Sequence, residues 1–413
     1  MDELFGANTQ TLKEINKSIV LSTIHKNDSI SRIEIAEITN LSVATVTNLV
    51  TELLEEKFII ETGYKKSTGG RRSGLLKINS ESLFIVGIEL GETEITALLT
   101  NFKLEKRAFK KISLDESENK PDKIISVIVD SIRSVISDHS ISLEKVLGVG
   151  IGVPGLVDRD RGVSIFAPNW GWHDVHMKEK IEKIIGIPTY IDNGAKVMAR
   201  GEKWAGAAQG TSNVIALIIG TGLGAGIIVN GKMCRGVSES AGEWGHMVIG
   251  INGPKCSCGN KGCLEAYAGV SAIAKRTKEI LLSTKEDSAL RQLGDIKPAK
   301  VVQKVIELAL KNDPIAIQVL KETGKYLGIG IANLVNLFNP EIVIIGGWVE
   351  IEAGKILLPV IRSTVKKYAL EFPFRSTEIV ISNLSDEAIV IGAAAMVLRK
   401  FLQPPKIKGM ESV

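Results

Sequence analysis

Cysteine and aromatic residues are scarce in this chain, which has four cysteines and 5% aromatic residues among 413. So few cysteines exclude a small scaffold held together by disulfides. A large excess of charge of one sign is also missing, since the net charge is +4 and 24% of the residues are charged. This mildly basic balance identifies no partner, and the hydrophobic share of 44% is that of an ordinary globular protein with a sizeable core.

Long hydrophobic runs are missing as well. The first ten residues, MDELFGANTQ, contain no apolar segment of a secretory signal. The most apolar stretch, residues 213–231, is interrupted by glycines, so it predicts two buried strands around a turn and no membrane span. We therefore expect a cytoplasmic protein without membrane association, in a compartment where thiols stay reduced.

The first 80 residues have the pattern of a winged helix-turn-helix domain. Apolar residues recur at helical spacing over residues 9–27. Ser31 and Ser42 stand where they can cap two further helices, and residues 58–79 are typical of two strands around a Gly-Gly turn. This order of elements predicts that the third helix enters the major groove of DNA.

Two groups of residues are candidates for DNA contact. The hairpin is a basic wing, because residues 57–77 include six basic residues and one acid, and Arg71 and Arg72 are placed to contact phosphates or a minor groove. The front of the third helix is small or polar and suits base edges, with Ser42, Ala44, Thr45, Thr47 and Asn48. The alternative is a surface helical hairpin with solvated charges, since residues 1–80 contain ten basic and ten acidic residues.

From residue 81 onward the pattern changes to strand-rich α/β. Residues 83–102 contain two apolar runs around a glycine turn, and residues 213–232 repeat this design about 130 residues later. Two such hairpins, each opening a lobe, predict a duplicated actin-like, hexokinase-like ATPase fold with a cleft between the lobes. We expect three segments: a winged helix at 1–80, a first lobe at 81–200, and a second lobe at 201–413 whose last helix packs back on the body.

Residues 245–263, GHMVIGINGPKCSCGNKGC, contain three of the four cysteines. One histidine and three thiolates complete a closed tetrahedral set for a structural zinc ion: His246, Cys256, Cys258 and Cys263. A mutual disulfide in the C-x-C pair is disfavoured, and the set leaves no open position for a catalytic water. The loop therefore predicts a metal site that anchors the segments bearing Glu243 and Glu265, the alternative being unliganded buried cysteines.

Several of these motifs occur together in one family. ESAGEWGHM and CSCGNKGCLEAYAG resemble the signature of the ROK family of repressors, open reading frames and sugar kinases. GVGIGVPGLVD, APNWGW, NPEIVIIGG and IGAAAMVL stand in the order of that family, and the winged helix with GGRR is similar to its repressor branch of xylose and N-acetylglucosamine repressors. The resemblance covers essentially the whole chain and implies the same fold, a zinc at the four residues above, and a bound sugar.

The residues that the resemblance assigns to sugar hydroxyls are Asn169, Asn193, Glu243, His246 and Glu265. Carboxylates and amides suit this task, because they hold vicinal hydroxyls with charge-assisted hydrogen bonds. The histidine can bind the metal through one ring nitrogen and orient towards the sugar through the other. Trp170 and Trp172 are equally compatible with a wall of the sugar site and with the core.

The chain departs from the kinase members of the family in two places. Asn193 is kept, but Gly194 stands where those enzymes carry the aspartate that takes the proton from the sugar. Loss of a general base typically costs a factor of about 10²–10⁴ in rate, and Asp192 on the neighbouring strand position points the opposite way. In the first hairpin, ELGETE places Glu92 and Glu94 where kinases have a glycine and a lysine, so bound ATP is not expected.

The second glycine turn keeps the kinase pattern and is interpreted as a vestigial phosphate loop formed by Gly220, Thr221, Gly222 and Gly224. We therefore predict a sugar-responsive repressor of carbohydrate utilisation, such as xylose metabolism, which binds operator DNA as a homodimer or dimer of dimers. The alternatives are an active sugar kinase with an appended DNA-binding domain, and an interaction protein whose first domain binds another protein.

Overall fold

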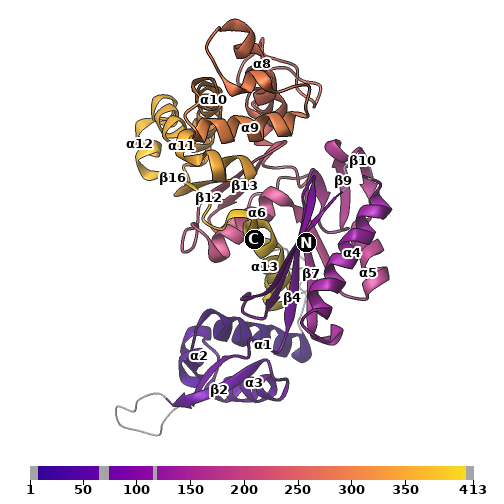
Figure 1. Cartoon of the computed structure of the whole chain (residues 1–413). Coiled ribbons are helices and arrows are strands. Elements are labelled where there is room, and N and C mark those ends of the chain that lie inside the picture. Colours follow the sequence, from indigo (N-terminus) through magenta and orange to yellow (C-terminus); the bar gives the residue numbers. More distant parts are fainter. Residues whose placement is uncertain (1–7, 65–73, 115–118, 406–413) are drawn as a thin grey trace, which may run out of the picture.

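The computed structural model describes residues 8–64, 74–114 and 119–405. Its first unit is a winged helix-turn-helix with a three-stranded sheet in the order β1-β3-β2. The elements are α1 (Thr9–Lys26), β1 (Ile30–Ser31), α2 (Arg32–Thr39), α3 (Val43–Glu55), β2 (Ile59–Tyr64) and β3 (Gly74–Ile78). The predicted winged helix is therefore confirmed, and it lies at one end of the molecule (Figure 1).

Local capping explains where the helices of this unit begin. The Ser31 side chain accepts from the Glu34 amide while the Glu34 carboxylate accepts from the Ser31 amide, which is a complete capping box. Ser42 caps α3 by accepting a hydrogen bond of 3.1 Å from the Thr45 amide. Between the two helices Asn40 adopts a left-handed conformation, which ends α2 and lets the chain turn.

The first lobe is built on a five-stranded sheet in the order β11-β7-β4-β5-β6. β4, β5 and β6 form an antiparallel meander, while β7 and β11 join in parallel. Helices α4 and α5 cover one face, and a small antiparallel sheet of β8, β9 and β10 lies beside them. The bounds are β4 (Phe84–Leu90), β5 (Glu94–Asn101), β6 (Lys106–Ser113), α4 (Pro121–Ser137), β7 (Val146–Val153), β8 (Leu156–Asp158), β9 (Val163–Ala167), β10 (Trp172–Val175), α5 (Met177–Ile185) and β11 (Thr189–Asn193).

The second lobe repeats this plan with a sheet in the order β14-β13-β12-β15-β16. It again opens with an antiparallel hairpin, β12 and β13, so the predicted duplication is confirmed. Helices α7 to α12 carry the rest of the lobe. The bounds are β12 (Val214–Ile219), β13 (Leu223–Val229), β14 (Lys232–Met233), α7 (Glu265–Ala268), α8 (Val270–Ser283), α9 (Pro298–Leu310), α10 (Pro314–Phe338), β15 (Ile342–Gly346), α11 (Trp348–Tyr368), α12 (Glu371–Ser376) and β16 (Glu378–Ile381).

Two helices cross at the centre of the molecule and join the lobes. α13 (Ala388–Leu402) packs on β4 and β7 of the first sheet, and α6 (Gly194–Ala205) packs on β12 and β13 of the second (Figure 1). The backbones of the two helices are in direct contact at their glycines. A Cβ on Gly201 would lie 1.9 Å from the Ala388 carbonyl oxygen, which leaves no room for a side chain. A Cβ on Gly392 would lie equally close to the Val197 carbonyl oxygen, so the two helices form one closely packed unit.

The winged helix shares its hydrophobic core with this unit. One continuous cluster contains Ile24 and Leu53 of the winged helix together with Ala394, Val397 and Leu398 of α13. The DNA-binding unit is therefore packed onto the body and is not suspended on a linker. Among the described residues, no helix combines the length and apolar character needed to cross a membrane.

Candidate metal centre and effector site

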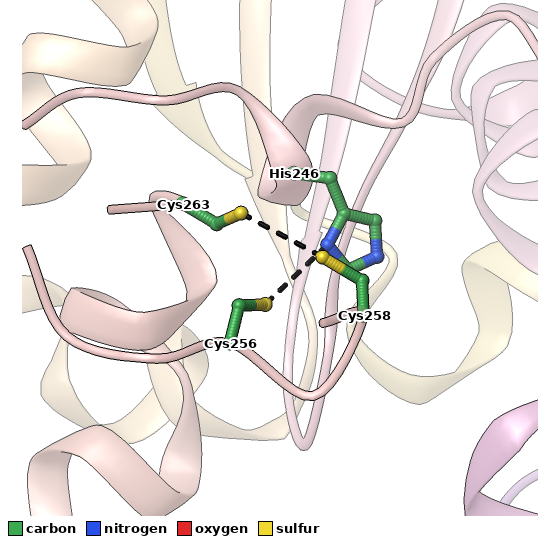
Figure 2. A group of neighbouring side chains, drawn as sticks. All are labelled: His246, Cys256, Cys258 and Cys263. Carbon is green, nitrogen blue, oxygen red and sulfur yellow. Dashed lines mark hydrogen bonds between the residues drawn. The ribbon is translucent and has the colours of Figure 1, made fainter. Parts of the chain in front are cut away.

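The His246–Cys263 loop folds back on itself and brings four donor side chains together. The short 3-10 helix η3 (Trp244–His246) presents the imidazole, and isolated bridges pair Val248 with Cys263 and Lys255 with Lys261. The donor atoms of His246, Cys256, Cys258 and Cys263 all lie within 4.8 Å of one another. Figure 2 shows the four side chains pointing towards a common centre.

The geometry of this cluster fits a tetrahedral metal ion. Cys258 Sγ and Cys263 Sγ are 3.7 Å apart, as are Cys256 Sγ and His246 Nδ1. A tetrahedral ion with Zn–S bonds of about 2.3 Å would place two sulfurs about 3.8 Å apart, whereas a disulfide would place them near 2 Å. The cysteines are free thiols, so the cluster can hold a metal ion.

The two best-placed thiols differ in acidity without an ion. A hydrogen bond from the Asn260 backbone lowers the pKa of Cys258, whereas burial raises the pKa of Cys263 to about 12. A buried thiol that resists ionisation needs a nearby cation to become a thiolate ligand. A metal ion bound at this cluster would favour the thiolate form, with proton release on binding.

The metal loop fixes two of the predicted sugar ligands. Glu243 immediately precedes η3, and Glu265 begins α7 two residues after Cys263. Glu265 accepts hydrogen bonds from the Leu223 amide at 3.0 Å and from the Ser257 hydroxyl at 3.2 Å. Its carboxylate is thereby oriented on the same side as the second glycine turn.

Glu243 is surface-accessible, yet protein on several sides removes part of its hydration. This partial burial raises the pKa of Glu243, and His246 and Lys196 oppose the shift while Glu265 adds to it. The structure thus places Glu243, His246 and Glu265 within electrostatic range of one another. Lys196, on the first turn of α6, also belongs to this group and was not predicted from the sequence.

Asn193 lies where β11 ends and α6 begins. Its side-chain oxygen Oδ1 caps the helix by accepting hydrogen bonds from the backbone amides of Ala195 and Lys196. Its side-chain nitrogen Nδ2 donates to the Gly155 carbonyl oxygen at 2.9 Å. The side chain is therefore rigidly held at the junction of the two lobes. The side chain of Asn169, the fifth predicted sugar ligand, lies outside what the structure describes.

The predicted tryptophan pair is part of the core. Trp170 and Trp172 are 6% and 3% exposed, and their rings lie 5.1 Å apart. Trp172 donates from its indole nitrogen to the Asn119 carbonyl oxygen at 2.7 Å. Of the two interpretations that the sequence left open, a wall of the sugar site and a place in the core, the packing favours the core.

The third helix of the winged unit presents the predicted DNA-contact residues on its free face. Ser42, Ala44, Thr47 and Asn48 are exposed, and Thr45 is half-buried. The opposite face, which includes Val46 and Leu49, is buried against α1 and α2. Arg71 and Arg72 of the wing lie outside the described residues.

Comparison with known proteins decides the family. A model of the ROK family matches residues 85–400, and a model of winged helix-turn-helix DNA-binding domains matches residues 16–60. The chain belongs to the ROK family.

Relatives of known name span its full length. A putative xylose repressor of Caldicellulosiruptor sp. (strain Rt8B.4) is 38% identical over 96% of this chain and 99% of its own. The DNA-binding transcriptional dual regulator NagC of Escherichia coli (strain K12) is 31% identical over 96% and 95%. The crystal structure of a ROK family transcriptional regulator, a homologue of the E. coli MLC protein, covers 95% of this chain and 98% of its own, with 28% identity and a TM-score of 0.83.

Gly194, which is predicted to stand at the position of the kinase base, has no side chain that could accept a proton. Gly194 is the first residue of α6, and a Cβ built on it would meet no atom closer than 3.7 Å. Glycine is therefore not required there by space. The adjacent Asp192 is 1% exposed and turned into the protein, where Arg235 binds both of its oxygens at 3.3 and 2.5 Å.

This Asp192–Arg235 pair joins the two lobes of the ROK fold. Asp192 ends a strand of the first sheet, whereas Arg235 lies in the loop after β14 of the second. Arg235 also binds Glu239, and Lys196 donates to the Glu239 carbonyl oxygen. Burial opposes the charge of Arg235, but its hydrogen bonds and ion pairs with Asp192 and Glu239 together raise its pKa. No sequence pattern links these residues, which lie 43 positions apart.

The first glycine hairpin of the ROK domain carries a half-buried acid, Glu89. Burial, followed by the charges of Asp386 and Glu94, raises the pKa of Glu89 to about 8, while Lys111 opposes the shift. Lys111 itself pairs with Glu94 at 2.9 Å and Asp386 at 2.7 Å. The hairpin is thus acidic, and Lys111 of β6 links its Glu94 to Asp386.

Glu89→Gln is expected to stabilise the chain only at high pH. The raised pKa means that the folded state favours protonated Glu89, so its stabilising contribution is complete below pH 4.5 and is lost as the pH rises through about 8. At pH 9 the variant should exceed the parent by up to about 2 kcal/mol in unfolding free energy, a value reduced for partial solvent access. Urea unfolding at pH 5 and pH 9 measures this, with the exposed Glu14→Gln as control. An equal gain at both pH values would contradict the assignment.

The second glycine turn has a packing role at Gly224. A Cβ there would lie 3.3 Å from the Cβ of Ala195, so the glycine lets α6 approach β13. At Gly222 a Cβ would lie 3.1 Å from the Glu265 carboxylate. Gly220 and Thr221 complete the turn, and the carboxylate of Glu265 already accepts the amide that follows it, at Leu223.

An aromatic cluster connects this site to the winged helix. Trp204, in the last turn of α6, lies 5.7 Å from the ring of His25 in α1. His25 hydrogen bonds through Nε2 to the Phe102 carbonyl oxygen at 3.1 Å, and burial lowers its pKa. Phe58 and Phe401 pack on Phe102 from the winged helix and from α13.

Proposed function

We propose that this ROK protein is a sugar-responsive transcriptional repressor of carbohydrate-utilisation genes. The observation that carries the proposal is the continuous packing from the effector site to the winged helix. Asn193 caps the beginning of α6, and Lys196 in its first turn lies near Glu243. Trp204 in the last turn of α6 lies against His25 of the DNA-binding unit. Relatives named xylose repressor support xylose as the effector.

The proposed sugar ligands are Asn169, Asn193, Glu243, His246 and Glu265. In this proposal Zn²⁺ is held by His246 Nδ1 and the three thiolates, and it supplies structural rigidity to the loop. His246 is then free to use Nε2 towards a sugar hydroxyl, because Nδ1 is the nitrogen that lies beside Cys256. The division into segments 1–80, 81–200 and 201–413, and assembly as a dimer on two half-sites, remain predictions.

We further propose that the bound sugar is not phosphorylated. Gly194 has no titratable group, and Asp192 is held in its ion pair with Arg235. Neither the parent nor Gly194→Asp should release ADP above background with xylose or glucose, because the acidic first hairpin still disfavours ATP. The substituted side chain has room, since no neighbouring atom lies within 3.7 Å of the new Cβ. Sugar-dependent turnover by the parent would overturn the repressor-only assignment.

The proposal as a whole is tested by sugar-dependent DNA binding. Full-length protein is incubated with DNA from its own promoter region, with and without xylose, glucose or N-acetylglucosamine, and the dissociation constant is measured by fluorescence anisotropy. One sugar is expected to change operator affinity about 5- to 150-fold, the usual range of coupling between two sites. No sequence-specific binding, or binding that no sugar alters, would contradict it.

Trp204→Leu should uncouple the two sites while leaving each one functional. The substitution removes the ring that touches His25 but retains an apolar side chain at the end of α6. We expect the sugar affinity and the sugar-free DNA affinity to stay within about twofold, and the effect of sugar on DNA binding to fall below about threefold. Phe372→Leu, at a ring that is 82% exposed on α12, is the matched control. If sugar changes the DNA affinity of Trp204→Leu as much as that of the parent, the contact between Trp204 and His25 does not couple the two sites.

A further inference from the structure

The free face of α3 is apolar although its sequence is rich in hydroxyl groups. Thr47 donates its hydroxyl to the Val43 carbonyl oxygen at 2.7 Å, and Thr51 donates to the Thr47 carbonyl oxygen at 2.9 Å. Each hydroxyl proton is consumed by the helix itself, which leaves the γ-methyl group as the outward part of the side chain.

The hydroxyls at the start of α3 take part in its cap. The oxygens of Ser42 and Thr45 lie 2.8 Å apart, so one hydroxyl donates to the other, and the Ser42 oxygen accepts from the Thr45 amide. These two residues therefore fix the beginning of the helix.

The remaining exposed side chains of α3 are Val43, Ala44 and Asn48 near its beginning and the acid Glu55 at its end. Val43 is an aliphatic side chain that is 52% exposed at the first position of the helix. No arginine or lysine occurs in α3, and the acid Glu52 is paired with Lys13 at 2.7 Å and with Lys17.

From this arrangement we infer that α3 reads thymine methyl groups and one adenine. Aliphatic groups contact the C5-methyl of thymine in the major groove, and an amide such as Asn48 pairs with adenine N6 and N7. Guanine is usually read by arginine or lysine and cytosine by a carboxylate, and the first half of α3, residues 43–48, has neither. The inference rests on the proposed operator binding, and the match of residues 16–60 to DNA-binding winged helices supports it independently.

The proposal requires a DNA half-site with A·T pairs at the positions that α3 contacts. Several thymine methyl groups of these pairs face the protein. Removing one buried methyl group weakens an apolar contact about 3- to 5-fold. A bidentate amide–adenine contact contributes roughly tenfold or more in discrimination. Specificity is therefore built from several small methyl contacts and one polar contact.

The experiment begins with selection of bound sequences from random duplex DNA by the full-length protein. A·T pairs should be enriched at the positions under α3. Each selected thymine is then replaced by deoxyuridine, which removes only the methyl group, and we expect about a 3- to 5-fold loss of affinity at two or more positions. Val43→Ala should reduce the thymine-to-uracil ratio at one position below about twofold, and Asn48→Ala should abolish the adenine preference at another.

Leu310→Ala is the matched control, because Leu310 is a similarly exposed aliphatic residue, 50% exposed, at the end of α9 in the second lobe. It should leave every thymine-to-uracil ratio unchanged. Two results overturn the inference: a selected core of G·C pairs, or deoxyuridine sites bound as tightly as thymine sites. If such a site still responds to sugar, the repressor function stands and only the base readout is wrong. Failure to enrich any sequence overturns both.

Discussion

Cys263→Ser is expected to abolish metal binding and sugar response together. Cys263 is completely buried at the base of the loop, and its neighbours Leu264 and Glu265 begin α7. If the loop holds the proposed zinc ion, removal of the fourth ligand releases that ion, and losses of this kind exceed about 4 kcal/mol of local stability. Zinc content by elemental analysis should fall from about one ion per chain to near zero. The sugar affinity should fall by at least about 100-fold, because Glu243, His246 and Glu265 lose their common support.

DNA binding in the absence of sugar provides the internal check of this result. The winged helix packs on α13 and the first sheet, so its operator affinity should remain within about threefold of the parent. Cys234→Ser is the matched control, since Cys234 is a half-buried free thiol outside the cluster. If the parent protein binds sugar normally after complete removal of zinc, the metal-bound loop does not support the sugar ligands and the prediction is wrong.

Breaking the Asp192–Arg235 pair is expected to cost about 3–5 kcal/mol of unfolding free energy. Asp192→Asn leaves Arg235 and Arg200 without their buried counter-charge, and burial already lowers the pKa of Arg200 to about 10. Arg235→Met leaves Asp192 with only Arg200, at 3.9 Å. The double variant should recover part of the loss, because Arg200 is then the one charge of this group that lacks its counter-charge, whereas Asp192→Asn leaves both Arg200 and Arg235 without theirs. Both single variants should also weaken sugar binding, since Arg235 and Lys196 hold the loop that leads to Glu243.

The control for this cycle is an exposed pair of the same chemistry. Arg375 and Glu371 form a salt bridge on α12 with both side chains about three-quarters exposed. Arg375→Met should cost less than about 1 kcal/mol. Urea unfolding measures the free energy of unfolding of all four variants. If Asp192→Asn loses no more of this free energy than Arg375→Met, the interlobe pair does not stabilise the fold.

Several features could be predicted because their signals are local. The four metal ligands lie within 18 positions and have a donor chemistry that few other roles require. Ser31 and Ser42 marked two helix starts, because capping depends on the next three residues. The paired glycine hairpins revealed the duplication of the two lobes through hydrophobic runs alone.

Other features depend on contacts between distant segments. Trp170 and Trp172 fit both a sugar wall and a core, and only the packed structure distinguishes these roles. The Asp192–Arg235 pair and the burial of Lys196 follow from how the lobes meet, which no periodicity encodes. The sequence also suggested a winged helix complete within its first 80 residues, whereas its core includes side chains from α13.

This last contact has a consequence for synthesis of the protein. Ala394, Val397 and Leu398 leave the ribosome long after Ile24 and Leu53, yet they complete the interior that surrounds these two residues. A polypeptide interrupted before α13 is therefore left with an open apolar surface on its winged helix, which favours proteolysis over folding. The winged helix is complete only in a chain that also contains both lobes.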